Sequence, residues 1–367
     1  MTLKVPDNQT IVIFGATGDL TGRKLMPALY NLFLESLLPE DFAVVGYSRT
    51  PMSNEEFREH QAANVAKYSR TGLDPEAWER FARHVEYMAG GFEPEGAMHP
   101  FAQRLEEVDA PIHGGGRRMF YCAVPPSLFP KIASRLGEEG LNRGGRIVME
   151  KPFGFDLASA QELNRQLHEV FDENQIYRID HYLGKETVQN ILVLRFANGM
   201  FEPVWNRRYV KQVQIDVAEE LGIEGRGRFY EEAGAMRDIV QNHIMQLLAF
   251  VTMEPPARFD AESIRDEKVK LLRSVPPVRR RERDLVRGQY VAGVVRGVLV
   301  PGYREEIDVA PESITETFVA IRMRVENWRW AGVPIIVRTG KRLARSATQI
   351  TISFAAAPHL LFEESGL

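Results

Sequence analysis

An apolar run followed at once by a glycine-rich turn constrains the fold of this chain more than any other feature. The run Thr10–Phe14 is continuous and mostly β-branched, which is typical of a strand covered on both faces of a sheet. The turn Gly15–Gly22 follows, and from about Arg23 apolar residues recur at helical spacing. A strand, a glycine-rich turn and a helix in this order predict the first βαβ unit of a parallel sheet.

The same alternation of strand and helix patterns continues to about residue 180. Further buried strands are predicted at Phe42–Gly46, Met119–Val124, Arg146–Met149 and Gln175–Ile179. From about residue 210 the apolar period becomes two, which is typical of half-buried antiparallel strands. These strands are predicted around Val213–Val217, Val319–Val325, Val333–Val337 and Ile350–Phe354, with one long helix at Ala235–Phe250.

Two domains are therefore expected, in agreement with a length of 367 residues. Residues 1–180 are predicted to form an α/β domain of the Rossmann-like, dinucleotide-binding kind. Residues 181–367 are predicted to form an α+β domain that combines a mainly antiparallel sheet with helices.

Charge and cysteine content exclude several classes of protein. Lysine and arginine number 46 against 50 aspartate and glutamate, so the net charge of −4 offers no general basic field for nucleic acid, and the basic run Arg279–Arg283 is interpreted as a solvated loop. Cys122 is the only cysteine, which excludes an internal disulfide and a cysteine-based zinc site, and its apolar surroundings predict a buried, inert thiol. No stretch of about 18 apolar residues and no signal-peptide pattern occur. We expect a cytoplasmic protein with no bound metal and no membrane contact.

The glycine-rich turn reads GATGDLTG. A pyrophosphate needs small residues there so that backbone amides and a helix N-terminus can approach it. The strict GxGxxG spacing is absent, because Thr17 stands where the second glycine is expected. By its composition the turn is equally well an ordinary strand-to-helix turn, but its position after the first strand favours a dinucleotide site.

The end of the second predicted strand distinguishes between coenzymes. NAD sites usually place an acidic residue there for the ribose 2′-hydroxyl. This chain has Arg49 instead, whose guanidinium suits a 2′-phosphate, with help from Thr50. A surface arginine at a strand end is the alternative. The pattern favours NADP without excluding NAD.

Two further segments carry residues of catalytic types. A helix beginning at His181 would place His181 and Lys185 on one face with Tyr182 beside them, an arrangement suited to a phosphate dianion. A polar helix start explains these three residues equally well. In the second segment, His243 shares an apolar helical stripe with Ile239 and its neighbours, and spacing alone favours a buried structural histidine over a base.

Taken together, the segments resemble the glucose-6-phosphate dehydrogenase family. Eight pieces match in the family's order and span nearly the whole chain: Gly15–Leu25 (GATGDLTGRKL), Gly46–Arg49 (GYSR), Glu150–Gly154 (EKPFG), Arg178–Glu186 (RIDHYLGKE), Glu224–Gly227 (EGRG), Arg237–His243 (RDIVQNH), Ile264–Val269 (IRDEKV) and Trp328–Leu343 (WRWAGVPIIVRTGKRL). The resemblance implies oxidation of glucose 6-phosphate at C1 to 6-phosphoglucono-δ-lactone with hydride transfer to NADP, the first step of the oxidative pentose phosphate pathway.

The resemblance also implies roles for individual residues. His243 would be the general base and Asp180 the carboxylate that orients it, roles that suit an imidazole near working pH. Pro152 would follow a cis peptide bond. The residues implied in substrate binding are His181, Tyr182, Lys185 and Lys341 for the phosphate, Glu219 and Asp238 for the sugar hydroxyls, and Lys151 between sugar and coenzyme. Those implied in coenzyme binding are Gly15, Thr17, Gly18, Asp19, Leu20, Arg49, Thr50 and Lys151.

The chain departs from the family pattern at its C-terminal end. It stops at Leu367, sooner than the resemblance leads one to expect, and the remaining part would complete the large sheet through which members form a homodimer or tetramer. Arg345 lies near the place of a further substrate-binding arginine, and its register is open. Two alternatives to an active enzyme of this family remain: another two-domain sugar oxidoreductase, and an NADP-binding chain without catalytic activity.

Overall fold

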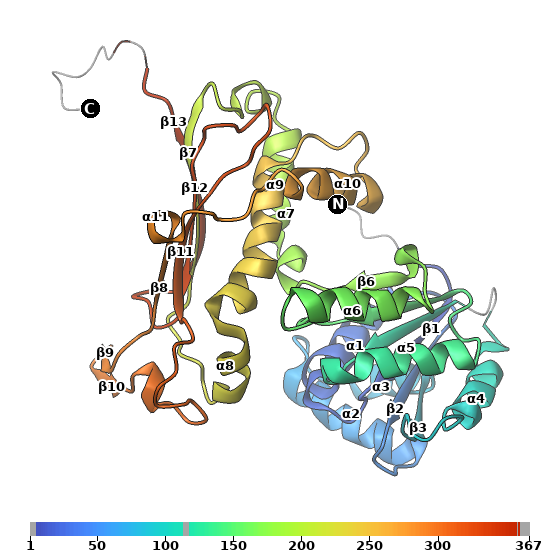
Figure 1. Cartoon of the computed structure of the whole chain (residues 1–367). Coiled ribbons are helices and arrows are strands. Elements are labelled where there is room, and N and C mark those ends of the chain that lie inside the picture. The colour runs from blue at the N-terminus through green and yellow to red at the C-terminus, as the bar shows by residue number, and fades with distance from the viewer. Residues whose placement is uncertain (1–4, 113–116, 358, 360–367) are drawn as a thin grey trace. The chain divides into compact units, whose positions relative to one another are not determined.

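The computed structural model describes residues 5–112, 117–357 and 359. It consists of two compact units, Met1–Ile179 and Asp180–Leu367, so the boundary lies one residue before the predicted one. Each unit has its own sheet and its own hydrophobic core (Figure 1). Among the described residues, every helix is too short or too polar to cross a membrane.

The first unit is built on a six-stranded, wholly parallel sheet with the order β3-β2-β1-β4-β5-β6. This is the strand order of a doubly wound sheet: β2 and β3 are added on one side of β1, and β4, β5 and β6 are added on the other side. The prediction of a Rossmann-like domain is confirmed. The strands are β1 (Gln9–Phe14), β2 (Phe42–Ser48), β3 (Val85–Ala89), β4 (Arg118–Cys122), β5 (Gly145–Met149) and β6 (Ile176–Arg178).

Helices cover both faces of this sheet (Figure 1). Alternate residues of β1 enter different cores: Ile11 and Ile13 pack with α1–α3, whereas Val12 and Phe14 pack with α4–α6. A strand buried on both faces favours apolar side chains at successive positions, which explains the run Ile11–Phe14. The helices are α1 (Met26–Leu34), α2 (Asn54–Tyr68), α3 (Pro75–Ala82), α4 (His99–Asp109), α5 (Phe129–Glu138) and α6 (Leu157–His168).

Cys122 lies at the end of β4 with none of its surface exposed. Burial raises the pKa of its thiol, because the thiolate would lose its hydration. The prediction that Cys122 is buried is confirmed, and the raised pKa agrees with an inert thiol.

The second unit contains a five-stranded sheet with the order β13-β7-β12-β11-β8, and a separate hairpin of β9 and β10. The strands are β7 (Val210–Ala218), β8 (Leu285–Gly288), β9 (Gly293–Val295), β10 (Val298–Val300), β11 (Phe318–Met323), β12 (Ile335–Gly340) and β13 (Ala347–Phe354). The prediction of antiparallel pairing holds for three neighbouring pairs of the sheet and is wrong for β7 and β12, which are parallel. A period of two reports which face of a strand is buried, and it contains no information on strand direction.

One face of this sheet carries the core of the second unit. Val213, Ile215 and Val217 of β7 point to that face together with alternate residues of β11 and β12, and they pack against α7 and α9 (Figure 1). The helices of the unit are α7 (Glu186–Phe196), α8 (Gly227–Ala235), α9 (Met245–Thr252), α10 (Ala261–Leu272) and the short α11 (Arg281–Asp284).

The helix predicted at Ala235–Phe250 begins and ends differently. Gly234, the last residue but one of α8, adopts φ = 62° and kinks the chain there. A π-helical segment then runs over Met236–Ile244 and continues directly into α9, which ends at Thr252. Glycine is needed at the break because a Cβ there would lie 2.8 Å from Oε1 of Glu316, in a backbone region that L-residues rarely adopt.

Candidate active site

The centre of the candidate site is a histidine–carboxylate pair in the second unit. His243 lies in the π-helical segment Met236–Ile244, with none of its surface exposed. Its Nδ1 is 2.5 Å from Oδ1 of Asp180, which also accepts the backbone N–H of Tyr182 at 3.0 Å. The histidine on the apolar stripe therefore has a specific carboxylate partner.

The surroundings keep Asp180 ionised. Burial alone would raise the pKa of this carboxyl, but the hydrogen bond and charge of His243 and the N–H of Tyr182 outweigh burial and lower the pKa. Its second oxygen, Oδ2, is buried without a hydrogen-bond partner among the described residues. Since a carboxylate can only accept, Nδ1 of His243 carries the hydrogen, and in that tautomer the lone pair is on Nε2.

Two residues that follow Asp180 contact the imidazole, and a third lies on one of them. The ring of Tyr182 stacks on His243 at 4.1 Å and 12°, and the ring of His181 meets His243 edge-on at 4.6 Å. Nζ of Lys185 lies 3.6 Å above the ring of Tyr182. Burial raises the pKa of the Tyr182 hydroxyl, so this group remains a hydrogen-bond donor at neutral pH.

The helix that the sequence pattern predicted from His181 does not form. His181–Gly184 is a single 3₁₀ turn, Lys185 has an extended backbone, and α7 starts at Glu186. The side chain of Asp180 caps the turn through the N–H of Tyr182, which favours a short turn at this place. The three side chains still gather in one cluster, through the turn and not through helical spacing.

A second cluster contains Lys341, Glu219 and Asp238. Nζ of Lys341 is 2.5 Å from Oε2 of Glu219 and 4.0 Å from Oδ2 of Asp238, and Lys341 is only 4% exposed. Glu219 directly follows β7 and Lys341 directly follows β12. Because these two strands are parallel neighbours, their carboxyl ends lie at the same edge of the sheet and bring the two residues together.

Sequence reasoning missed two residues beside these clusters. Tyr230 of α8 lies with its ring 5.4 Å from Nζ of Lys341, and its buried hydroxyl has no partner among the described residues. Lys268 of α10 donates to Oε1 of Gln246 at 2.9 Å; burial lowers its pKa, and the charge of Asp180 acts in the opposite direction. Lys268 belongs to the family-like segment Ile264–Val269, but the sequence analysis assigned it no role. Nothing in the sequence singled out Tyr230.

The predicted coenzyme turn in the first unit has a tightly packed backbone that a phosphate group could approach closely. Gly15 has φ = 83°, and a Cβ there would lie 2.2 Å from the carbonyl oxygen of Ala123. The N–H of Gly18 and the hydroxyl of Thr21 both donate to the carbonyl of Gly15, at 2.9 and 3.1 Å. The turn then passes into a π-helical segment, Thr21–Leu25, and α1. These residues fit a pyrophosphate held on a backbone turn.

Hydroxyl groups gather where the predicted 2′-phosphate would lie. Oγ1 of Thr17 is 2.9 Å from Oγ of Ser48 and 3.4 Å from Oγ1 of Thr50. The hydroxyl of Tyr87, on the strand β3 that the sequence did not predict, donates to the carbonyl of Thr50 at 2.5 Å. Arg49 is exposed beside this group, so its guanidinium is accessible to an anion. Among the other predicted coenzyme residues, Gly18 and Asp19 are exposed and Leu20 is half-buried.

Lys151 belongs to the first unit, and its placement beside the sugar stays a prediction. Its bond to Pro152 is cis, as the resemblance implied. The preceding residue, Glu150, accepts a hydrogen bond from the hydroxyl of Tyr121 at 2.5 Å. Arg345, whose register the sequence left open, is exposed.

Asp180, His181 and His243 also form the one group of described residues whose ligand atoms could hold a metal ion, with all atoms within 4.8 Å of one another. We assign no metal to this group. Oδ1 of Asp180 is already engaged by Nδ1 of His243.

A doubly wound coenzyme unit joined to a mixed-sheet unit with a buried His–Asp pair defines a two-domain, nicotinamide-dependent dehydrogenase. The family model "Glucose-6-phosphate dehydrogenase, NAD binding domain" matches residues 12–190, and "Glucose-6-phosphate dehydrogenase, C-terminal domain" matches residues 192–366. The chain belongs to the glucose-6-phosphate dehydrogenase family.

Individual relatives agree with this assignment. The glucose-6-phosphate 1-dehydrogenase of Aggregatibacter actinomycetemcomitans is 48% identical over 365 residues, which cover 98% of this chain and 74% of the relative. The protein of the same name from Bacillus subtilis is 46% identical, over 96% of this chain and 72% of the relative. A solved glucose-6-phosphate dehydrogenase in complex with glucose 6-phosphate has a TM-score of 0.90 at 38% identity, over 99% of this chain and 75% of that chain. The Mycobacterium avium enzyme has a TM-score of 0.84 at 36% identity, over 97% of this chain and 75% of that chain.

Proposed function

We propose that this chain oxidises glucose 6-phosphate at C1 to 6-phosphoglucono-δ-lactone, with NADP as the hydride acceptor and His243 as the general base. Membership of the glucose-6-phosphate dehydrogenase family supports the reaction and the coenzyme. The observation that carries the mechanism is the buried contact of 2.5 Å between His243 and Asp180. NADP, when bound, supplies the hydride-accepting carbon, and the protein supplies placement and proton transfer.

In this proposal Nε2 of His243 takes the proton of the C1 hydroxyl while the hydride leaves C1. The C1–oxygen bond becomes a carbonyl, so one proton and one hydride leave the sugar. The imidazolium that forms is stabilised by the ionised carboxylate of Asp180, whose pKa is held low by the same contact. General-base assistance of this kind contributes typically ~10²–10⁴-fold to the rate.

In this proposal one of the two clusters binds the phosphate of the substrate and the other binds the sugar hydroxyls. His181, Tyr182 and Lys185 combine hydrogen-bond donors with positive charge, as a phosphate dianion requires. The second cluster offers carboxylates that accept from sugar hydroxyls and an ammonium that donates, and it consists of Glu219, Asp238 and Lys341. Lys151 is assigned a place between sugar and coenzyme.

The coenzyme is assigned to the turn after β1 and to the end of β2. The turn residues are Gly15, Thr17, Gly18, Asp19 and Leu20. The close packing of Gly15 against Ala123 supports this assignment, because it leaves no room for a side chain at the base of the turn. Arg49 and Thr50 are assigned to the 2′-phosphate.

The direct test is the initial rate of reduced-nicotinamide formation from glucose 6-phosphate, with NADP and NAD in parallel. A rate that depends on the sugar phosphate supports the proposal. Turnover of an unphosphorylated sugar alone would favour another sugar oxidoreductase. Calorimetric binding of NADP without turnover would favour a coenzyme-binding chain without activity.

Lys185→Ala is expected to raise KM for glucose 6-phosphate by about 10–100-fold, because a charge-assisted hydrogen bond contributes roughly 1.5–3 kcal/mol. The kcat should change much less, since Lys185 lies on Tyr182 and not on the His–Asp pair. Steady-state kinetics measures both constants, and Lys211→Ala, an exposed lysine of β7, is the matched control. An unchanged KM in Lys185→Ala would remove this residue from the phosphate site.

Arg49→Ala is expected to raise KM for NADP by about tenfold or more and to leave KM for NAD unchanged, because only NADP carries the 2′-phosphate. The NAD measurement on the same preparation serves as the control for folding. Equal losses with both coenzymes would show that Arg49 does not contact the 2′-phosphate.

The homodimer or tetramer and the cytoplasmic location stay predictions.

A further inference from the structure

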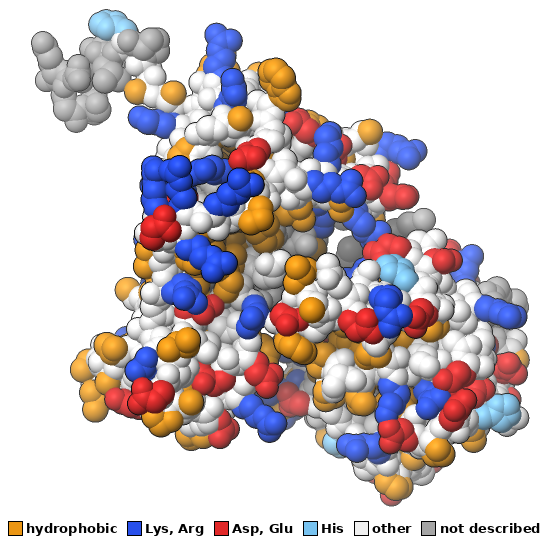
Figure 2. All heavy atoms as spheres, in the orientation of Figure 1, with side chains coloured by type: hydrophobic (Ala, Val, Ile, Leu, Met, Phe, Trp, Pro, Cys, Tyr) orange, Lys and Arg blue, Asp and Glu red, His pale blue; other side chains and the backbone are white. Residues whose placement is uncertain are grey.

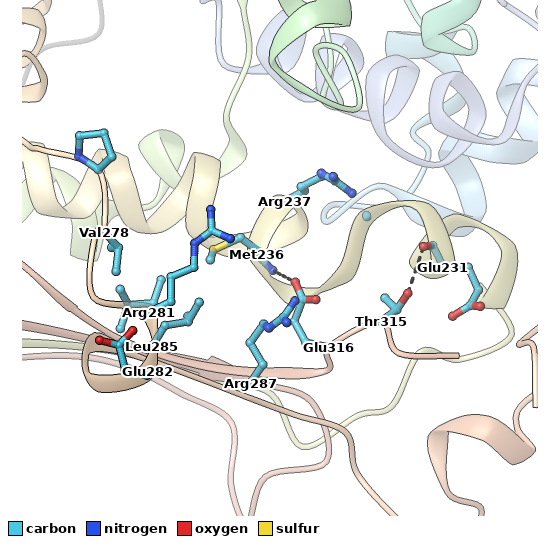
Figure 3. Close-up of a pocket in the computed structure, with 13 residues that line it drawn as sticks. Glu231, Met236, Arg237, Val278, Arg281, Glu282, Leu285, Arg287, Thr315 and Glu316 are labelled. Atoms are coloured by element: carbon cyan, nitrogen blue, oxygen red, sulfur yellow. Dashed lines mark hydrogen bonds between the residues drawn. The ribbon is translucent and has the colours of Figure 1, made fainter. Parts of the chain in front are cut away.

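A cavity of about 640 Å³ in the second unit shares no residue with the candidate active site. Its walls come from α8 and the start of the π-helical segment, from α11 and β8, and from residues just before and within β11 (Figure 3). Binding sites for small molecules typically enclose about 300–1,000 Å³. The cavity is therefore large enough for a small organic ligand.

Two of the arginines that line this cavity carry a positive charge that no described carboxylate neutralises through an ion pair. Arg281 and Arg287 both line it, and both are exposed. Neither guanidinium makes a hydrogen bond or an ion pair with any residue that the structure describes. In Figure 3 the guanidinium of Arg281 is directed toward Met236 and that of Arg287 toward Glu316, and both residues line the cavity. Each guanidinium is planar and carries five N–H donors, so the two arginines together can donate several hydrogen bonds to the oxygens of a phosphate.

The other charged groups that line the cavity are Arg237, Glu231, Glu282 and Glu316, and most of them have partners in the fold. Glu231 accepts the hydroxyls of Tyr303 and Ser313 at 2.5 and 2.6 Å. Glu316 accepts the N–H of Met236 at 3.1 Å, which caps the π-helical segment.

Arg237 donates to the carbonyl of Glu232 at 2.8 Å, and Figure 3 shows its guanidinium directed away from Arg281 and Arg287. An anionic ligand could therefore bind Arg281 and Arg287, which have no other partner among the described residues. The carboxylate oxygens that line the cavity can accept hydrogen bonds from hydroxyl groups of the same ligand.

The remaining wall is apolar. Met236, Val278, Leu285 and Ile321 line it, and Figure 3 shows Met236 beside the guanidinium of Arg281. An inorganic anion would leave this surface in contact with water, whereas an organic phosphate would cover it.

We propose that this cavity binds a nucleotide-sized organic phosphate, with its phosphate on Arg281 and Arg287, its hydroxyls on the carboxylates and its flat apolar part on the Met236–Leu285 wall. The site would give a role to part of the basic run Arg279–Arg283, which the sequence suggested only as a solvated loop. Figure 2 shows Lys and Arg side chains gathered over the part of the second unit that contains α11, which would attract an anion toward this opening.

Protection of arginines from phenylglyoxal tests the proposal residue by residue, with ADP as the probe. Arg281 and Arg287 are exposed and should react readily. ADP at ten times its Kd is expected to slow their modification about tenfold, because the free-site fraction falls by that factor. Mass spectrometry of the peptides separates this effect from any binding of ADP to the coenzyme unit. Arg279, exposed in the same run but outside the cavity, is the internal control.

Three results would overturn the proposal: unchanged rates at Arg281 and Arg287, equal slowing at Arg279, and equal protection by adenosine or by pyrophosphate. The last two probes lack the phosphate and the organic part, respectively. Equilibrium dialysis adds a second readout, in which the Arg281→Gln/Arg287→Gln variant should lose one ADP site per chain and Arg279→Gln/Arg283→Gln should keep it. Equal ADP stoichiometry in the two double variants would also contradict the proposed site.

Discussion

His243→Asn is expected to lower kcat for glucose 6-phosphate oxidation by about 10²–10⁴-fold, the usual contribution of a general base. Asparagine keeps a polar side chain of similar size but cannot take up the proton of the C1 hydroxyl. KM for NADP should change little, because the residues assigned to the coenzyme belong to the first unit. The measurement is the steady-state rate of reduced-nicotinamide formation at saturating substrates.

The control for this variant is structural, because His243 is fully buried. Near-UV circular dichroism reports whether the aromatic side chains of the whole chain keep their packing, and unchanged NADP binding reports an intact first unit. A correctly folded His243→Asn protein with undiminished kcat would show that another group removes the proton. Lys268, which lies within the field of Asp180, would then be the next residue to replace.

Asp180→Asn is expected to lower kcat by a comparable factor, about 10²–10⁴-fold. The amide oxygen can still accept the N–H of Tyr182, so the 3₁₀ turn should persist. It cannot stabilise an imidazolium, and it no longer requires the tautomer that leaves the lone pair on Nε2. Asp216→Asn is the matched control and should keep kcat, because it removes a carboxylate of β7 that is paired with Arg338 of β12.

The double variant His243→Asn/Asp180→Asn decides whether the two residues act as one unit. If Asp180 acts only through the imidazole, the double variant should be no slower than His243→Asn alone, because effects within a catalytic unit are not additive. Multiplied losses of kcat would contradict this and would assign Asp180 a contact of its own with the substrate.

The first unit was the easier part to predict. Strands buried on both faces leave an uninterrupted apolar run, so β1, β2, β4 and β5 were visible in the sequence. Strand β3 was missed because its sequence, VEYMA, combines an acidic residue with a short run, and its outer position in the sheet leaves it partly exposed. That strand carries Tyr87, so the hydroxyl network beside Thr50 was missed with it.

The second unit shows which features the apolar pattern of the sequence could not predict. Alternation placed Val213, Ile215 and Val217 correctly on the core face of β7 but could not specify the direction of its neighbour β12. The parallel pairing of these strands is what brings Glu219 and Lys341 together at one sheet edge, across 122 residues of sequence. Spacing likewise suggested a helix from His181, where the side chain of Asp180 instead caps a single turn.

The sequence by itself determined the two kinds of sheet, the coenzyme turn and the family, because apolar periodicity and ordered local motifs are written in neighbouring residues. Only the tertiary structure decided the site. Asp180 and His243 are 63 positions apart, and their contact exists because the π-helical segment and the turn before α7 pack together around one core. A local sequence pattern cannot predict a contact between residues so far apart in the chain. Spacing alone therefore favoured a structural role for His243, and only the structure shows that it is one partner of a buried pair.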